Sequence, residues 1–140
     1  MARVLIIEAD GGSRGNPGES GSGAIVVDQG SGELLAEISL YGGVASNNVA
    51  EYKGMIAGVR RAIEIDGDAE LLVRLDSKLV VEQMSGRWKI KHPAMAELAA
   101  IAREALIGTP VRFEWIPREI NTRADKLANL AMDLRRDTIR

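Results

Sequence analysis

Apolar residues follow two different spacings along the chain, and the first of them predicts strands. Branched apolar residues are concentrated in five segments that are too short for helices and are bounded by turn-forming residues. These segments are residues 3–10, 21–27, 34–41, 71–76 and 111–116. The glycines of residues 28–32 favour a hairpin loop between the second and third segments. We expect the first strand to end at Asp10, before a turn at Gly11 and Gly12.

The second spacing, with apolar residues at three- and four-residue steps, predicts four helices. They are expected from residue 48 to about residue 66 and at residues 77–84, 94–106 and 121–134, with Asn121 capping the last one. An antiparallel start followed by alternating helices and strands predicts one mixed sheet with helices packed on it. The fold class is therefore α/β.

Composition narrows the possible classes of function. The 140 residues, of which 46% are apolar, suit a single globular domain (residues 1–140) with a real core. The absence of Cys excludes disulfides and zinc-thiolate sites, and the single His excludes multi-histidine metal sites. No apolar run approaches the ~20 residues that span a bilayer, so we expect a soluble, cytoplasmic protein without a membrane partner.

The charge balance limits how a nucleic acid would be bound. With 18 basic and 20 acidic residues the formal net charge is −2, so such a partner must be held by a local basic patch. Aromatic residues make up only 4% of the chain, too few for a platform of stacking rings. We expect a monomer with no obligatory protein partner.

Four acidic residues stand near the ends of the expected elements, and each also has a purely structural explanation. Asp10 precedes two glycines, where Asp commonly forms turns. The spacing of Asn48 and Glu51 is that of a helix capping box, and Asp76 is placed to cap the next helix. Asp125 lies near a helix N-terminus, where the helix dipole favours acids.

Taken together, the four acids indicate a metal site. If the strands ending at Asp10 and Asp76 are parallel neighbours, both carboxylates project from the same edge of the sheet, which the helices of Glu51 and Asp125 can also reach. Converging carboxylates repel one another unless hard cations neutralise them. The pattern therefore favours magnesium or manganese.

Residues 11–18 are glycine-rich but lack the Lys-Ser/Thr ending of a phosphate loop.

At these acids the sequence resembles the type 1 ribonuclease H family. The matching stretches are ADGGSRGNPG at residues 9–18, NNVAEY at 47–52, LDSKLV at 75–80, WIPRE at 115–119, Asn121, and ADKLA at 124–128. The resemblance implies a five-stranded mixed sheet, with three antiparallel strands followed by two parallel ones, flanked by helices. It also implies an endoribonuclease that hydrolyses the RNA strand of RNA–DNA hybrids and leaves 5′-phosphate and 3′-hydroxyl ends.

The resemblance further implies catalysis by two Mg²⁺ or Mn²⁺ ions held by the four acids. Asp10 would bridge both ions, Asp125 would complete the ion on the nucleophile side, and Glu51 and Asp76 would hold the ion on the leaving-group side. The residues expected to contact the substrate are Gly11, Asn16, Ser46, Asn47, Asn48, Lys78, Arg87, Trp88, Lys89, Lys91 and Arg118.

Two features depart from the family pattern. The loop at residues 117–123 carries no histidine, so Arg118 or Glu119 would have to take its place, and we expect a solvated or capping role for His92. The basic helix and loop that many members insert after the third acid is reduced to residues 85–92. This short segment is either a small basic patch or an ordinary loop with its tryptophan packed on the core.

Two other functions compete with the ribonuclease. An inactive copy of the fold could serve as a binding module, but all four acids are present. DNA-cutting transposases and junction resolvases carry similar carboxylate clusters, but the Asn47-Asn48 pair and the Asp76-Ser77-Lys78 motif favour the ribonuclease. Similar domains occur alone or fused ahead of a phosphatase-like domain, so residues 135–137 are read as a tail or the start of a linker.

Overall fold

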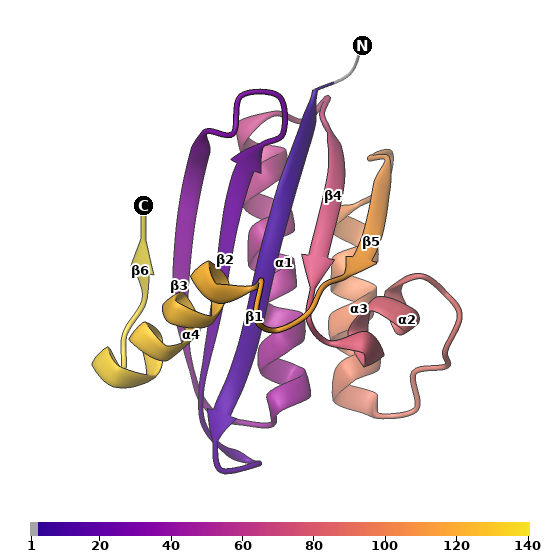
Figure 1. The fold of residues 1–140 in the computed structure, drawn as a ribbon. Coiled ribbons are helices and arrows are strands. Elements are labelled where there is room, and N and C mark those ends of the chain that lie inside the picture. Colours follow the sequence, from indigo (N-terminus) through magenta and orange to yellow (C-terminus); the bar gives the residue numbers. More distant parts are fainter. Residues whose placement is uncertain (1–2) are drawn as a thin grey trace.

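A mixed sheet of six strands runs through the middle of the molecule in the computed structural model, which describes residues 3–140. The strands are β1 (Val4–Arg14), β2 (Gly18–Asp28), β3 (Leu34–Ala45), β4 (Glu70–Leu75), β5 (Val111–Trp115) and β6 (Thr138–Ile139). Their spatial order is β5-β4-β1-β2-β3-β6 (Figure 1). The pairs β1–β2, β2–β3 and β3–β6 are antiparallel, and β1–β4 and β4–β5 are parallel. This confirms the expected three antiparallel and two parallel strands.

Helices cover both faces of this sheet. They are α1 (Asn47–Ile65), α2 (Lys78–Met84), α3 (Pro93–Ala105) and α4 (Thr122–Leu134). α4 lies across β2 and β3 on one face, and α1 and α3 lie on the other (Figure 1). The main core forms between the sheet and α1, where Ile7 and Val73 are fully buried with Met55 and Val59. Among the described residues, no helix is long and apolar enough to cross a membrane.

The first strand is longer than the sequence predicted. The expected turn at Gly11 and Gly12 is wrong, because β1 continues to Arg14 and Gly12 pairs with Gly21 of β2. Glycine serves close packing here instead of a turn. A Cβ on Gly11 would lie 2.2 Å from the carbonyl carbon of Ala50 in α1. The small residue therefore lets the helix lie directly against the strand.

The expected helix caps are also corrected. α1 is capped by the Ser46 hydroxyl, which accepts a hydrogen bond from the Val49 amide, and not by Asn48. α2 is capped by the Ser77 hydroxyl, one residue after Asp76. The carboxylates of Glu51 and Asp76 are therefore not occupied as caps.

A sixth strand after α4 corrects the expected count of five. The backbone reverses at Arg135, which has a left-handed φ of 53°. Thr138 and Ile139 then pair with β3, and the Asp137 carboxylate accepts a hydrogen bond from the Tyr41 amide at 2.8 Å. The segment after α4 thus covers part of the β3 edge, whose backbone groups would otherwise be unpaired.

Candidate active site

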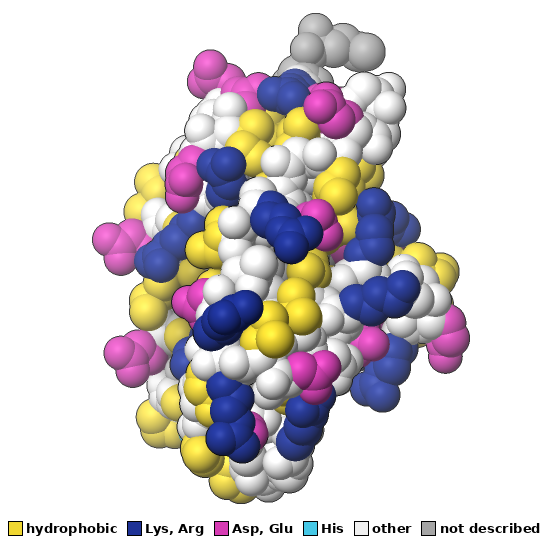
Figure 2. Space-filling model, turned by 90° about the vertical axis from the view of Figure 1, so that its left-hand side faces the viewer, with side chains coloured by type: hydrophobic (Ala, Val, Ile, Leu, Met, Phe, Trp, Pro, Cys, Tyr) yellow, Lys and Arg dark blue, Asp and Glu magenta, His cyan; other side chains and the backbone are white. Residues whose placement is uncertain are grey.

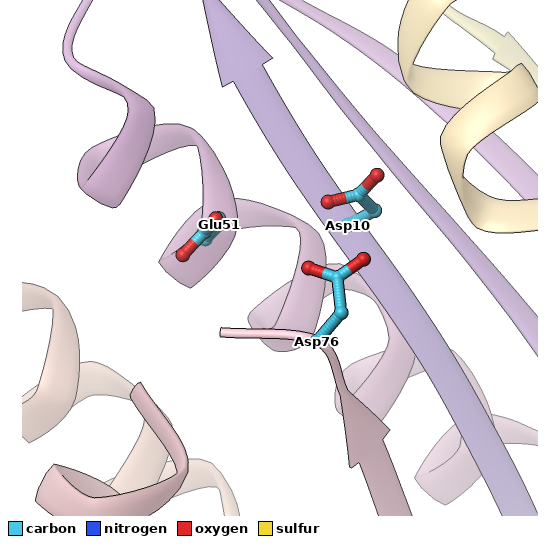
Figure 3. A group of neighbouring side chains, drawn as sticks. All are labelled: Asp10, Glu51 and Asp76. Atoms are coloured by element: carbon cyan, nitrogen blue, oxygen red, sulfur yellow. The ribbon is translucent and has the colours of Figure 1, made fainter. Parts of the chain in front are cut away.

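Asp10 and Asp76 lie where two parallel strands separate. β1 and β4 are paired up to Ala9 and Leu75, and the two acids are the next residue on each strand. β4 ends there, whereas β1 continues along β2. The two carboxylates therefore stand side by side at the carboxyl end of β4, where the prediction placed them (Figure 3).

Glu51 reaches the same place from α1. The helix is held against β1 by glycines at contact positions: a Cβ on Gly54 would lie 2.7 Å from the carbonyl oxygen of Asp10. In Figure 3 the Glu51 side chain lies across the gap from Asp10 and Asp76. Each of the three residues offers one carboxylate oxygen within 4.8 Å of the others. The tertiary structure thus forms a cluster of three acids.

Burial and mutual repulsion make this cluster hard to ionise. Burial, followed by the charge of Asp76, raises the pKa of Asp10 to about 8. Burial raises the pKa of Glu51 to about 7 and also raises that of Asp76. Among the residues that the structure describes, the buried Glu51 Oε2 atom has no hydrogen-bond partner. An unpaired carboxylate oxygen beside two other acids fits a hard divalent cation, which prefers oxygen ligands.

The fourth acid, Asp125, lies outside the cluster. Its exposed side chain comes from the first turn of α4 and lines the same cleft, of about 350 Å³, as Asp10 and Glu51. Its charge is among the later causes, after burial and Asp76, of the raised pKa of Asp10. The structure therefore brings three of the four predicted acids together and places the fourth on the wall of the cleft.

Several predicted substrate contacts are tied into one hydrogen-bonded unit at this cleft. Asn47 Oδ1 accepts hydrogen bonds from the Ser13 amide at 2.7 Å and from the Ser13 hydroxyl at 3.0 Å. Asn16 Oδ1 accepts from the Asn47 amide at 3.1 Å. The β1–β2 hairpin is thereby fixed to the start of α1, next to the Ser46 cap and to Asn48. Gly11 lines the cleft, but its packing against Ala50 explains the glycine without any ligand.

The short basic segment, residues 85–92, has fewer unpaired positive side chains than its sequence indicates. The Arg87 guanidinium donates to both carboxylate oxygens of Glu82, one of them at 2.9 Å. Lys89 and Lys91 are exposed, and neither forms an ion pair within residues 3–140. Trp88 is 46% exposed, so it is not buried in the core. Elsewhere, basic and acidic side chains are interspersed on the face that Figure 2 shows.

His92 caps a helix, one of the two roles expected for it. Its Nδ1 accepts a hydrogen bond from the Ala94 amide at 3.2 Å at the start of α3. We expect His92→Ala to lower stability by about 1 kcal/mol through loss of the cap. Catalytic turnover should stay within about threefold, because His92 is not among the residues that line the cleft of the acids. Urea unfolding and steady-state kinetics test both parts, and a hundredfold loss of turnover in folded protein would contradict the second.

Three further residues of α4 line the cleft beside Asp125 and were not predicted as site residues from the sequence. Asn129 donates from Nδ2 to the Asp125 carbonyl oxygen at 3.0 Å and to Oδ1 at 3.4 Å. Ala128 and Met132 lie on the same wall. The four-residue spacing from Asp125 to Asn129, which puts both on one helix face, is the signal that could have found Asn129.

Comparisons with known proteins agree with this geometry. Residues 8–131 match the family described as reverse transcriptase-like. The chain is 53% identical over 131 residues to the bifunctional protein Rv2228c of Mycobacterium tuberculosis, covering 92% of the chain but 35% of that protein. The chain thus spans about a third of the length of this relative. It is 40% identical over 128 residues to ribonuclease HI of Halobacterium salinarum, covering 89% of the chain and 62% of that protein.

Solved structures share the fold. The N-terminal ribonuclease H domain of Rv2228c from M. tuberculosis superposes with a TM-score of 0.90 at 51% identity, covering 95% of this chain and 96% of that one. LC11-RNase H1, solved in complex with an RNA/DNA hybrid, has a TM-score of 0.88 at 39% identity, covering 94% and 98%. Both likenesses extend over nearly the whole chain.

Proposed function

The chain belongs to the ribonuclease H family, and on that premise we propose that it is an endonuclease that hydrolyses the RNA strand of RNA–DNA hybrids. The observation that carries the proposal is the cluster of Asp10, Glu51 and Asp76, each of which offers one oxygen within 4.8 Å of the others, at a cleft that Asp10 and Glu51 line. The hybrid bound by the similar LC11-RNase H1 supports the choice of substrate. The expected products carry 5′-phosphate and 3′-hydroxyl ends.

The acids would hold two Mg²⁺ or Mn²⁺ ions with the substrate bound. Asp10 is proposed to ligate both ions, because it belongs to the cluster with Glu51 and Asp76 and also lines the cleft with Asp125, whose charge contributes to its raised pKa. Glu51 and Asp76 would complete one ion, and Asp125 the other. When bound, such ions activate water and stabilise the charge that develops on the leaving oxygen.

Arg118 is proposed to bind the substrate beside these acids. It lines the same cleft as Asp10 and Glu51. Burial raises the pKa of Glu51 most, and the positive charge of Arg118 acts in the opposite direction. A guanidinium in this position can donate two parallel hydrogen bonds to a phosphate of the RNA strand. Arg118, which belongs to the loop without a histidine, would thus hold a backbone phosphate next to the acids.

The polar end of the cleft is proposed to contact the sugar-phosphate backbone. The side-chain oxygen Oδ1 of Asn47 accepts from Ser13, so the side-chain Nδ2 group of Asn47 is available to donate to an acceptor on the substrate. Contacts to 2′-hydroxyl groups distinguish RNA from DNA, and Glu51 lies close enough to this end to share them. The selectivity for the RNA strand would follow from these contacts.

Cleavage of an RNA–DNA hybrid with differently labelled strands tests the proposal. With Mg²⁺ or Mn²⁺ we expect the RNA strand to be cut and the DNA strand to stay intact, and no cleavage in excess EDTA. Binding without cleavage would support the inactive binding module. Cleavage of the DNA strand would support a transposase-like or resolvase-like enzyme. Either result would overturn the ribonuclease.

The basic segment yields a prediction about affinity. Changing Lys89 and Lys91 together to Ala should raise the Michaelis constant for the hybrid. It should also flatten the log-log dependence of affinity on salt by up to about 0.9 per lost phosphate contact. Turnover should change far less, because these contacts bind ground state and transition state alike. Steady-state kinetics at several KCl concentrations measure both quantities.

Arg87→Ala is the matched comparison for this pair. Because the Arg87 guanidinium is held by Glu82, its removal should change the salt slope less than the removal of either lysine. If the double lysine variant keeps both the Michaelis constant and the salt slope of the wild type, the segment is only a solvated loop. Lys78, which is exposed at the start of α2, and Trp88 remain proposed contacts of the hybrid.

A further inference from the structure

Asn121 is buried at the start of α4 but does not act as the cap that the sequence predicted. The residue is 0% exposed and occupies the N-cap position, yet its side chain makes no capping hydrogen bond. Asn is among the preferred N-cap residues because its oxygen accepts from the helix amides. Here the side chain is directed to other partners.

Those partners belong to the two strands that carry acids. Asn121 Nδ2 donates to the Ala9 carbonyl oxygen at 2.8 Å and to Asp76 Oδ2 at 3.2 Å. The backbone ladder between β1 and β4 ends at the pair Ala9 and Leu75. Beyond that pair, the side-chain amide of Asn121 links the two strands. It bonds to the main chain of β1 at Ala9, the residue before Asp10, and to the carboxylate of Asp76, the residue after β4.

The Trp115 side chain also holds Asp76, through a hydrogen bond to the Asp76 main chain. Trp115 Nε1 donates to the Asp76 carbonyl oxygen at 3.1 Å, and the Ile116 amide donates to the Leu75 carbonyl oxygen at 2.9 Å. The segment from Trp115 to Asn121 therefore contacts Asp76 at both its main chain and its side chain. These contacts hold Asp76 in place although its carboxylate lies beside that of Asp10, where like charges repel.

The orientation of the Asn121 side chain leaves two polar requirements unmet. It gives up the helix cap, and among residues 3–140 its buried Oδ1 atom has no hydrogen-bond partner. Buried polar atoms are ordinarily paired, and an unpaired one is costly. A side chain selected only to start α4 would cap it. The observed orientation instead directs the Nδ2 group to the Ala9 carbonyl oxygen and the Asp76 carboxylate.

We propose that Asn121 is a positioning residue that, together with Trp115, sets the separation of Asp10 and Asp76 and thereby the affinity of the acid cluster for a divalent cation. The effect on turnover rests on the proposed ribonuclease function, whereas the effect on cation affinity does not. Groups that orient metal-binding carboxylates typically change metal affinity or activity by about 10- to 100-fold when removed.

Asn121→Ser separates positioning from folding. Serine is also a favoured N-cap residue, but its hydroxyl is too short to reach both Ala9 and Asp76, so the helix start is retained and the link is lost. Calorimetric titration with Mn²⁺ in the absence of nucleic acid should show about 10-fold or greater weakening. On the hybrid, turnover should fall by about 10- to 100-fold while the Michaelis constant stays within about threefold.

Val59→Ala is the control for a general loss of stability. Val59 is fully buried in α1, so its truncation destabilises the protein without touching the acids. The control should keep the Mn²⁺ affinity and turnover of the wild type at a temperature where it is folded. Wild-type Mn²⁺ affinity in Asn121→Ser would overturn the positioning role. Equal losses of affinity in both variants would do so too, because the effect would then be one of general stability.

Two further results keep the inference distinct from the proposed function. If Asn121→Ser does not fold, Trp115→Phe replaces it under the same criterion, since Trp115 is 49% exposed and tolerates the change. If the wild type does not cleave a hybrid but Asn121→Ser still weakens Mn²⁺ binding, the proposed function fails and the positioning role stands. If the wild type cleaves the hybrid and Asn121→Ser matches it in both Mn²⁺ affinity and turnover, the proposed function stands and the positioning role fails.

Discussion

Asp10→Asn is expected to abolish hybrid cleavage, by about a thousandfold or more, while the protein stays folded. Asp10 belongs to the cluster with Glu51 and Asp76 and lines the same cleft as Asp125, so its loss would disturb the ligands of both proposed ions. Metal ions supply several kcal/mol of transition-state stabilisation, and each 1.36 kcal/mol is a factor of ten in rate. Single-turnover cleavage under saturating Mg²⁺ measures the loss. Near-wild-type activity would remove Asp10 from the site.

The same substitution should leave the metal-free protein as stable as the wild type or more so. Because the pKa of Asp10 is raised to about 8, the folded state keeps a proton that the unfolded state loses above about pH 4. The contribution of Asp10 to stability is therefore present at low pH and is lost as the pH rises from about 4 to about 8. The raised pKa of Glu51, about 7, acts in the same direction.

Thermal unfolding in EDTA at pH 5 and pH 8 tests this sign. The wild type should lose stability between the two values, and Asp10→Asn should lose less, because the amide does not ionise. Added Mn²⁺ should stabilise the wild type more at pH 8 than at pH 5, since bound cations favour the ionised carboxylates. A wild type that gains more stability than the variant on going to pH 8 in EDTA would contradict the repulsion between the acids.

Gly11→Ala is expected to have the second large effect, on folding and on the site together. A Cβ at Gly11 would lie 2.2 Å from the Ala50 carbonyl carbon and 2.4 Å from the Glu51 amide nitrogen. These are backbone atoms, so α1 itself must move away from β1. We expect a loss of about 3 kcal/mol or more, the upper end of overpacking costs. Displacing Glu51 by about 1 Å would also lower turnover by about a hundredfold.

Gly12→Ala is the matched control, because it makes the same change one residue further along β1. The nearest atom to a Cβ at Gly12 is Asn47 Oδ1, at 3.8 Å, and neither glycine has a left-handed φ. Stability should therefore stay unchanged or rise by up to about 1 kcal/mol. Urea unfolding of the two variants decides the matter. Equal losses would show that strand glycines, and not the contact with α1, determine the outcome.

The types of the main helices and strands could be predicted because their signals are local. The three- and four-residue spacing of Tyr52, Met55 and Val59 marks one buried helix face. The short branched apolar segments mark the buried strands of the sheet. The acids Asp10, Glu51 and Asp76 could likewise be named beforehand, since strand ends and family motifs identify them in the sequence.

The extents and caps of the elements were harder to predict because they depend on contacts between distant segments. Gly11 has the local signature of a turn but lies in a strand, because α1 needs its missing side chain for close packing. Asn48 and Ser46 are both suitable caps by residue type. The path of the chain from β3 into α1 makes Ser46 the cap.

The helix and strand periods and the candidate acids can be recognised in the sequence alone, because periodicity is encoded in neighbouring residues. Three features depend on how the chain folds: Asp10 and Asp76 follow the last pair of a parallel ladder, Asp125 lies apart on the cleft wall, and Asn121 links two strands instead of capping its helix. The partner of a buried amide or carboxylate is chosen by packing between segments as far apart as Ala9 and Asn121.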